Sequence, residues 1–148
     1  MKRFQFKFDT LLRVREEKEN AAQQKLSFER QALQEHLDDK GRLENEGKDV
    51  EDNMRFAKES RIDAAAFVNN LHYMEALRGK IAQKEDDVMR QQNVVEEKRG
   101  EAAAAMRERK VIENLKEKKY GQWKREAAAA ESAFLDEQAT QRYYKDKQ

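Results

Sequence analysis

The strongest constraint on this chain is a mirror pattern of apolar residues about Ile62. Residues at equal distances before and after it are apolar on both sides: Val50 with Met74, Leu43 with Ile81, Ala22 with Ala102, and Leu12 with Ile112. Two antiparallel helices place residues equally far from their turn at the same height, so the pattern predicts a helical hairpin. Asp63 is expected to cap the second helix, because its carboxylate can accept hydrogen bonds from free backbone N–H groups.

The predicted fold is all-α, a single antiparallel two-helix coiled coil. Arm one is expected over about 4–59, the turn over 60–63 and arm two over 64–145, so that the C-terminal helix overhangs the first. Charged residues make up 41% of the sequence and proline is absent, a composition typical of long helices. Because no proline or glycine forces the turn, one uninterrupted helix is the alternative.

The second arm has the more regular apolar stripe. Its members repeat every seven residues: Met74, Ile81, Val88, Val95 and Ala102, flanked by Leu71, Leu77, Val94, Ala105 and Met106. A sustained seven-residue repeat predicts a left-handed supercoil of the two arms. The same stripe would alternatively support association with a second chain.

The first arm has a weaker seam. Its positions are Ala22, Leu26, Glu29, Leu33, His36, Lys40, Leu43, Gly47, Val50, Met54 and Ala57, of which several are polar. Polar seam residues lower stability but help to fix register. Lys40 is expected to pair with Glu85 across the seam.

The N-terminal segment alternates phenylalanine with polar residues. Phe4, Phe6 and Phe8 would suit a short strand, but no second strand is available, so helix is favoured. The mirror rule places Phe4 opposite Tyr120 and Phe8 near Leu115 and Lys116. Packing on the second arm is therefore favoured over a partner contact.

Beyond Tyr120 no residue of the first arm remains to pair with the second arm, yet an apolar stripe continues there. Trp123, Ala127, Ala130 and Phe134 follow one another at spacings of four, three and four residues. An apolar stripe without a partner in the chain is a candidate docking surface. Alternatively, the N-terminal phenylalanines cover part of it, or the tail frays.

The charge distribution and the residue inventory argue against several functions. Residues 35–59 have a net charge of −4 and residues 98–125 one of +6, but acidic residues interrupt the basic stretch and nucleic-acid binding is disfavoured. Glycine-rich phosphate loops and cysteines are absent, and His36 and His72 cannot meet in the hairpin. We expect no catalysis, cofactor or metal. No stretch is apolar enough for a membrane span or secretory signal, which indicates a soluble intracellular protein.

Four segments resemble one protein family. They are Phe4-x-Phe6-x-Phe8-Asp9-Thr10-Leu11-Leu12-Arg13-x-Arg15, the segment from Phe67-Val68-Asn69 to Leu77, Arg109-Lys110-Val111-Ile112-Glu113-x-Leu115-Lys116-Glu117-Lys118, and Leu135-Asp136-Glu137-Gln138-Ala139. In this order and spacing they are similar to FliJ, the soluble coiled-coil component of the bacterial flagellar type III export apparatus. The resemblance covers nearly the whole chain.

The resemblance implies a non-catalytic hairpin similar to the stalk of rotary ATPases. Such a protein inserts into the export ATPase ring, contacts the export gate and escorts empty export chaperones. The implied partners are the ATPase hexamer and its regulator, the cytoplasmic domain of the gate membrane protein, and the chaperones. Membrane insertion is not implied, and the implied location is cytoplasmic, at the inner membrane beneath the flagellum.

Two sets of contact residues follow from the resemblance. The gate contact falls to Leu43, Val50, Tyr73 and Leu77; the ATPase contact falls to Arg107, Arg109, Lys110, Trp123 and Phe134. Glu46 and Val50 stand where some relatives have aromatic residues, so the gate patch is less aromatic here. The alternatives are a homodimerising structural coiled coil, the stalk of a type III secretion injectisome, and a basic nucleic-acid-binding helix.

Overall fold

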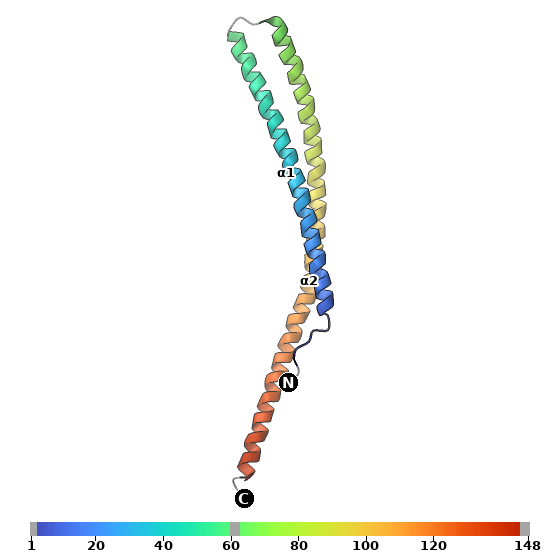
Figure 1. Cartoon of the computed structure of the whole chain (residues 1–148), viewed down its shortest axis with the longest axis vertical. Helices are drawn as coiled ribbons and strands as arrows, with labels where there is room; N and C mark the ends of the chain where they lie inside the picture. Colours follow the sequence, from blue (N-terminus) through green and yellow to red (C-terminus); the bar gives the residue numbers. More distant parts are fainter. Residues whose placement is uncertain (1–2, 60–62, 146–148) are drawn as a thin grey trace. The chain divides into compact units, whose positions relative to one another are not determined.

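The computed structural model describes residues 3–59 and 63–145 of the chain. Helix α1 spans Asp9–Glu59 and helix α2 spans Ala64–Lys145 (Figure 1). The prediction of an all-α helical hairpin is confirmed. Of the predicted turn, residues 60–62 lie outside the described residues.

The start of α2 is capped as predicted. The Asp63 side-chain Oδ1 accepts a hydrogen bond from the Ala65 N–H at 3.0 Å, and its carbonyl oxygen accepts one from the Phe67 N–H at 3.2 Å. The first bond satisfies a donor that the first turn of a helix leaves free, and the second is the first backbone bond of the helix itself. Ala64, Ala65 and Ala66 then have the highest helix propensity of any residue type.

Helix α1 starts later than predicted. Residues 3–8 are not helical, and the first helical residue is Asp9. The Phe8 carbonyl accepts from the Leu12 N–H at 2.9 Å, and the Asp9 carboxylate lies where the helix dipole favours negative charge. The prediction that the segment from Phe4 to Phe8 is helical was therefore wrong. We call residues 3–8 the N-terminal strap.

The chain forms two compact units, which we describe separately. One unit comprises residues 21–102, and the other comprises the residues up to Asn20 together with those from Ala103 onward. Both α1 and α2 contribute a segment to each unit. Within the described parts of the chain, no helix is long and apolar enough to cross a membrane.

In the unit of residues 21–102, the two helices bury the predicted seam. Its most buried residues are Leu26, Met74, Leu77, Val88 and Ala102. Every predicted seam position from Ala22 to Ala57 of α1 is buried or half-buried, including Glu29, His36 and Lys40. Leu71, expected to flank the stripe of α2, is instead 48% exposed.

Polar contacts across this seam show which residues of α1 and α2 lie opposite each other. Lys40 Nζ lies 3.5 Å from Glu85 Oε1, as predicted, and Gln91 Nε2 donates to the Glu29 carboxylate at 2.6 Å. Lys40 and Glu85 lie 22 and 23 residues from Ile62. The mirror rule is thus accurate to within one residue here.

The terminal unit repeats this arrangement with a smaller core. Phe6 of the strap, Leu12 of α1 and Ala105 of α2 are buried. Glu108 of α2 accepts from Arg15 and, at 2.9 Å, from Lys18, while Lys116 donates to Asp9 at 2.6 Å. Alanine contributes little apolar area. The ion pairs between α1 and α2 therefore contribute a larger share of the stability of this unit than they would in a seam of leucines.

Gly47 lowers the stability of α1. It lies inside the helix, and a Cβ added there would meet no atom within 4 Å. We expect Gly47→Ala to raise the free energy of unfolding by about 1 kcal/mol, because alanine loses less backbone entropy. Urea denaturation followed by circular dichroism measures this, with Gly41→Ala as a second open site; a lower midpoint for both variants would contradict it.

Candidate functional site

The N-terminal strap packs on α2 through an aromatic cluster. The Phe4 ring lies edge-on to Tyr120 with centroids 5.2 Å apart, and 5.8 Å from Trp123; the Tyr120 and Trp123 rings stack at 5.7 Å. Lys116 Nζ lies 5.9 Å from the Phe6 ring centroid. The predicted pairing of Phe4 with Tyr120 is confirmed, as is the alternative that the N-terminal phenylalanines cover part of the overhang.

Sequence reasoning missed that the strap is not helical. The signal was present, because alternation of phenylalanine with polar residues is a two-residue period and not a helical one. In the structure, alternate residues of the strap pack against helix α2. Phe4 and Phe6 face α2, whereas Gln5 and Lys7 are exposed.

Past the strap, α2 continues without cover from α1. Every residue from Ala128 to Lys145 is exposed, among them Phe134 at 58% and Leu135 at 57%. We call residues 121–145, which follow Tyr120, the C-terminal overhang. Of the predicted docking stripe, Trp123 is thus half-buried beneath Phe4 and Phe134 is open.

The basic residues assigned to the ATPase contact differ in availability. Arg107 and Lys110 are exposed. Arg109 is half-buried and donates to Glu19 of α1 and to Glu113 of its own helix; its hydrogen bond to Glu19 raises the pKa of the guanidinium further above its usual range. Arg109 therefore joins the two helices, whereas the charged side chains of Arg107 and Lys110 are exposed.

The residues assigned to the gate contact also divide into exposed and buried members. Tyr73 is 41% exposed and donates its hydroxyl to the Glu46 carboxylate across the seam. Leu43 and Val50 are half-buried, while Leu77 is only 2% exposed. Of this set, Tyr73 offers the most surface, and Leu77 supports it from the core.

Two further apolar residues near Tyr73 were not singled out from the sequence as surface residues. Val68 and Leu71 are both 48% exposed and lie three residues apart on α2. Residues at this spacing are neighbours on a helix surface. Leu71 precedes Tyr73 by two residues, about 200° around the helix, so Val68 and Leu71 form a separate exposed apolar pair near the start of α2.

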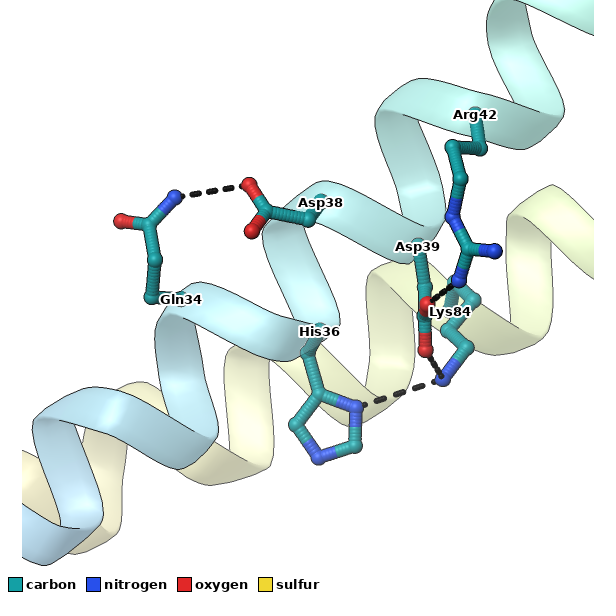
Figure 2. Close-up of polar contacts among 6 residues, drawn as sticks. All are labelled: Gln34, His36, Asp38, Asp39, Arg42 and Lys84. Carbon is teal, nitrogen blue, oxygen red and sulfur yellow. Dashed lines mark hydrogen bonds and ion pairs between the residues drawn. The ribbon is translucent and has the colours of Figure 1, made fainter.

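A polar cluster interrupts the apolar seam midway along this unit. Figure 2 shows Lys84 of α2 reaching between His36 and Asp39 of α1: its Nζ lies 3.0 Å from Asp39 Oδ2 and 3.4 Å from His36 Nδ1. Arg42 donates to the other oxygen of Asp39. Hydrogen bonds from Lys84 and, next, from Arg42 lower the pKa of Asp39 below its usual 3.8.

This cluster lacks the features of a reactive site. All its members are at least partly open to solvent. No group of acidic, histidine or cysteine side chains that could hold a metal is present in the described ranges. The geometry suits a contact that aligns two helices.

Comparison with known proteins gives one match. The family model described as flagellar FliJ protein matches residues 4–148. The searches of curated proteins and of solved structures gave no match.

The lowered pKa of Asp39 predicts a pH-dependent contribution to stability. Because the folded pKa lies below the unfolded value, this contribution is complete above about pH 4 and is lost as the pH falls through the folded pKa. We expect Asp39→Asn to lower the melting temperature at pH 7, and the difference from wild type to shrink below about pH 4.

The matched control for this experiment is Asp38→Asn. Asp38 accepts only from Gln34 of its own helix, at 2.8 Å, among the contacts described, and points away from Lys84 (Figure 2). Asparagine can keep that bond, so the control should change the melting temperature little at any pH. A difference for Asp39→Asn that is constant from pH 7 to pH 3 would contradict the assignment.

Proposed function

The chain belongs to the FliJ family of flagellar proteins, and on this premise we propose that it is a non-catalytic stalk of the flagellar type III export apparatus. In this role it links the export ATPase ring to the export gate and escorts export chaperones. The family supports a component of flagellar export in general. The finer assignment rests on the surfaces described above.

The observation that carries the proposal is the C-terminal overhang. An exposed helix with Phe134 and Leu135 on its surface has apolar area that its own chain leaves uncovered. Large apolar side chains exposed together mark interaction sites. We assign the ATPase contact to this overhang, with Arg107 and Lys110 contributing charge.

The gate contact is assigned to the other unit. Tyr73 lies there on α2, 41% exposed and held in place by its bond to Glu46. Tyrosine is enriched at the centres of protein interfaces because it combines a large apolar ring with a polar group. Leu43, Val50 and Leu77 would act by supporting this surface.

Helix α2 carries residues of both proposed contacts. It runs from Ala64 to Lys145 and includes Tyr73, Trp123 and Phe134. The backbone hydrogen bonds of an α-helix are internal, so a single continuous helix connects the two proposed contacts along the chain. This continuity suits a linker between two machines.

The alternatives are less well supported. Homodimerisation through the Met74 to Ala102 stripe would need a surface that the hairpin buries within one chain. An injectisome stalk would have the same shape, but the family match is to a flagellar family. The proposed location is the cytoplasm, at the inner membrane beneath the flagellum, with the ATPase regulator and the chaperones as further partners.

The ATPase contact predicts a kinetic effect. The wild-type chain should stimulate ATP hydrolysis by the cognate export ATPase, and Phe134→Ala with Trp123→Ala should raise the half-maximal concentration roughly tenfold, as loss of an aromatic anchor does. Phe28→Ala is the matched control, since Phe28 is 70% exposed in the other unit. Absence of stimulation by the wild-type chain would refute the stalk proposal.

The gate contact predicts a loss of affinity that is confined to one surface. We expect Tyr73→Ala to weaken binding to the purified cytoplasmic domain of the gate protein roughly tenfold, measured by calorimetry. Met89→Ala, at a residue 61% exposed on the same helix, should bind as wild type. Equal losses in both variants would argue against a specific contact at Tyr73.

A further inference from the structure

Charge is unevenly divided along α2 where the C-terminal overhang begins. Residues 116–125 contain Lys116, Lys118, Lys119, Lys124 and Arg125 with one glutamate, whereas residues 126–139 contain Glu126, Glu131, Asp136 and Glu137 and no basic residue. Adjacent helical stretches of opposite charge are self-complementary when two copies run antiparallel. Each basic stretch then meets the acidic stretch of the other copy.

We propose that the overhang binds a second copy of this chain as an antiparallel helix pair. The stripe of Trp123, Ala127, Ala130 and Phe134 has the spacing of a coiled-coil seam. In the antiparallel register centred between Ala128 and Ala129, Trp123 of one copy packs on Phe134 of the other. Ala127 likewise packs on Ala130.

The charges at the edge of this seam favour the same register. Lys124 and Glu131 lie seven residues apart on the edge of the stripe, and the antiparallel arrangement brings Lys124 of each copy beside Glu131 of the other. Two-fold symmetry forms this pair twice. On the opposite edge, Glu126 meets Ala133, so no like charges face each other there.

The alanines set how closely the helices approach. Residues 127–130 are four consecutive alanines, and Ala130 is exposed. Interaxial distances between packed helices fall to about 8 Å where the contacting side chains are small. A pair centred on these alanines therefore packs tightly while its aromatic residues close the two ends.

The strap competes with the second copy for Trp123. Phe4 already lies 5.8 Å from the Trp123 ring and 5.2 Å from that of Tyr120, on the seam that Phe134 of the second copy would use. Pairing must therefore displace Phe4. The strap limits self-association, and removing its contact strengthens the pair.

Sedimentation equilibrium of the full chain tests the proposal over a concentration series, with no ATPase present. The wild-type chain should show a reversible monomer–dimer equilibrium. Phe134→Ala should weaken it at least tenfold, whereas Phe4→Ala should strengthen it several-fold. Phe134 is exposed, so its replacement leaves the fold intact, which circular dichroism verifies.

Charge reversal tests the register. Lys124→Glu and Glu131→Lys should each weaken the dimer roughly tenfold, since each replaces two attractions by two repulsions. The double reversal in one chain should restore it. Lys80→Glu, at an exposed position in the unit of residues 21–102, is the control and should leave the dimer unchanged.

Three results would overturn the proposal. They are a wild-type chain that stays monomeric at millimolar concentration, a dimer that Phe134→Ala leaves intact, and a double reversal no stronger than the single reversals. None depends on an ATPase, so the outcome is separate from that of the stalk proposal. A dimer lost in Phe134→Ala while ATPase stimulation is absent would support pairing and refute the stalk.

Discussion

The alignment of α1 against α2 depends on polar contacts that cross a thin seam. In residues 21–102 these contacts are Lys84 with Asp39 and Lys40 with Glu85, and in the terminal unit Arg109 with Glu19. Ion pairs that are exposed or half-buried contribute little to stability, because solvent screens them. These ion pairs instead favour one alignment of the two helices. A shifted alignment would place like charges together, and the seam has too few aliphatic residues to offset that repulsion.

Much of the fold could be predicted from the sequence because a hairpin imposes a simple symmetry. Apolar residues equidistant from Ile62 indicated the pairing, and Asp63 indicated the cap. The strap was predicted as a helix because no second strand was available to pair with it, although its two-residue alternation of phenylalanine with polar residues favours a non-helical segment. The stack of Tyr120 and Trp123 decides between them, and that surface forms only once α2 is in place.

The candidate contacts were predicted less well than the fold. The family resemblance pointed to a set of positions without distinguishing exposed from buried ones, so Leu77 was grouped with Tyr73 although only Tyr73 reaches the surface. Arg109 was likewise grouped with Lys110, because a sequence does not show which cation an acidic residue across the seam will engage. These differences in exposure depend on where each residue lies around the helix axis, because successive residues are rotated by about 100°.

The polar seam residues have a further consequence for the chain outside its folded state. A hairpin held by leucines would expose a continuous apolar strip on opening, and such strips aggregate. Here Glu29, His36 and Lys40 interrupt the strip on α1. During synthesis the segment of α1 is complete before that of α2, and these polar residues reduce its tendency to aggregate until α2 can pack against it.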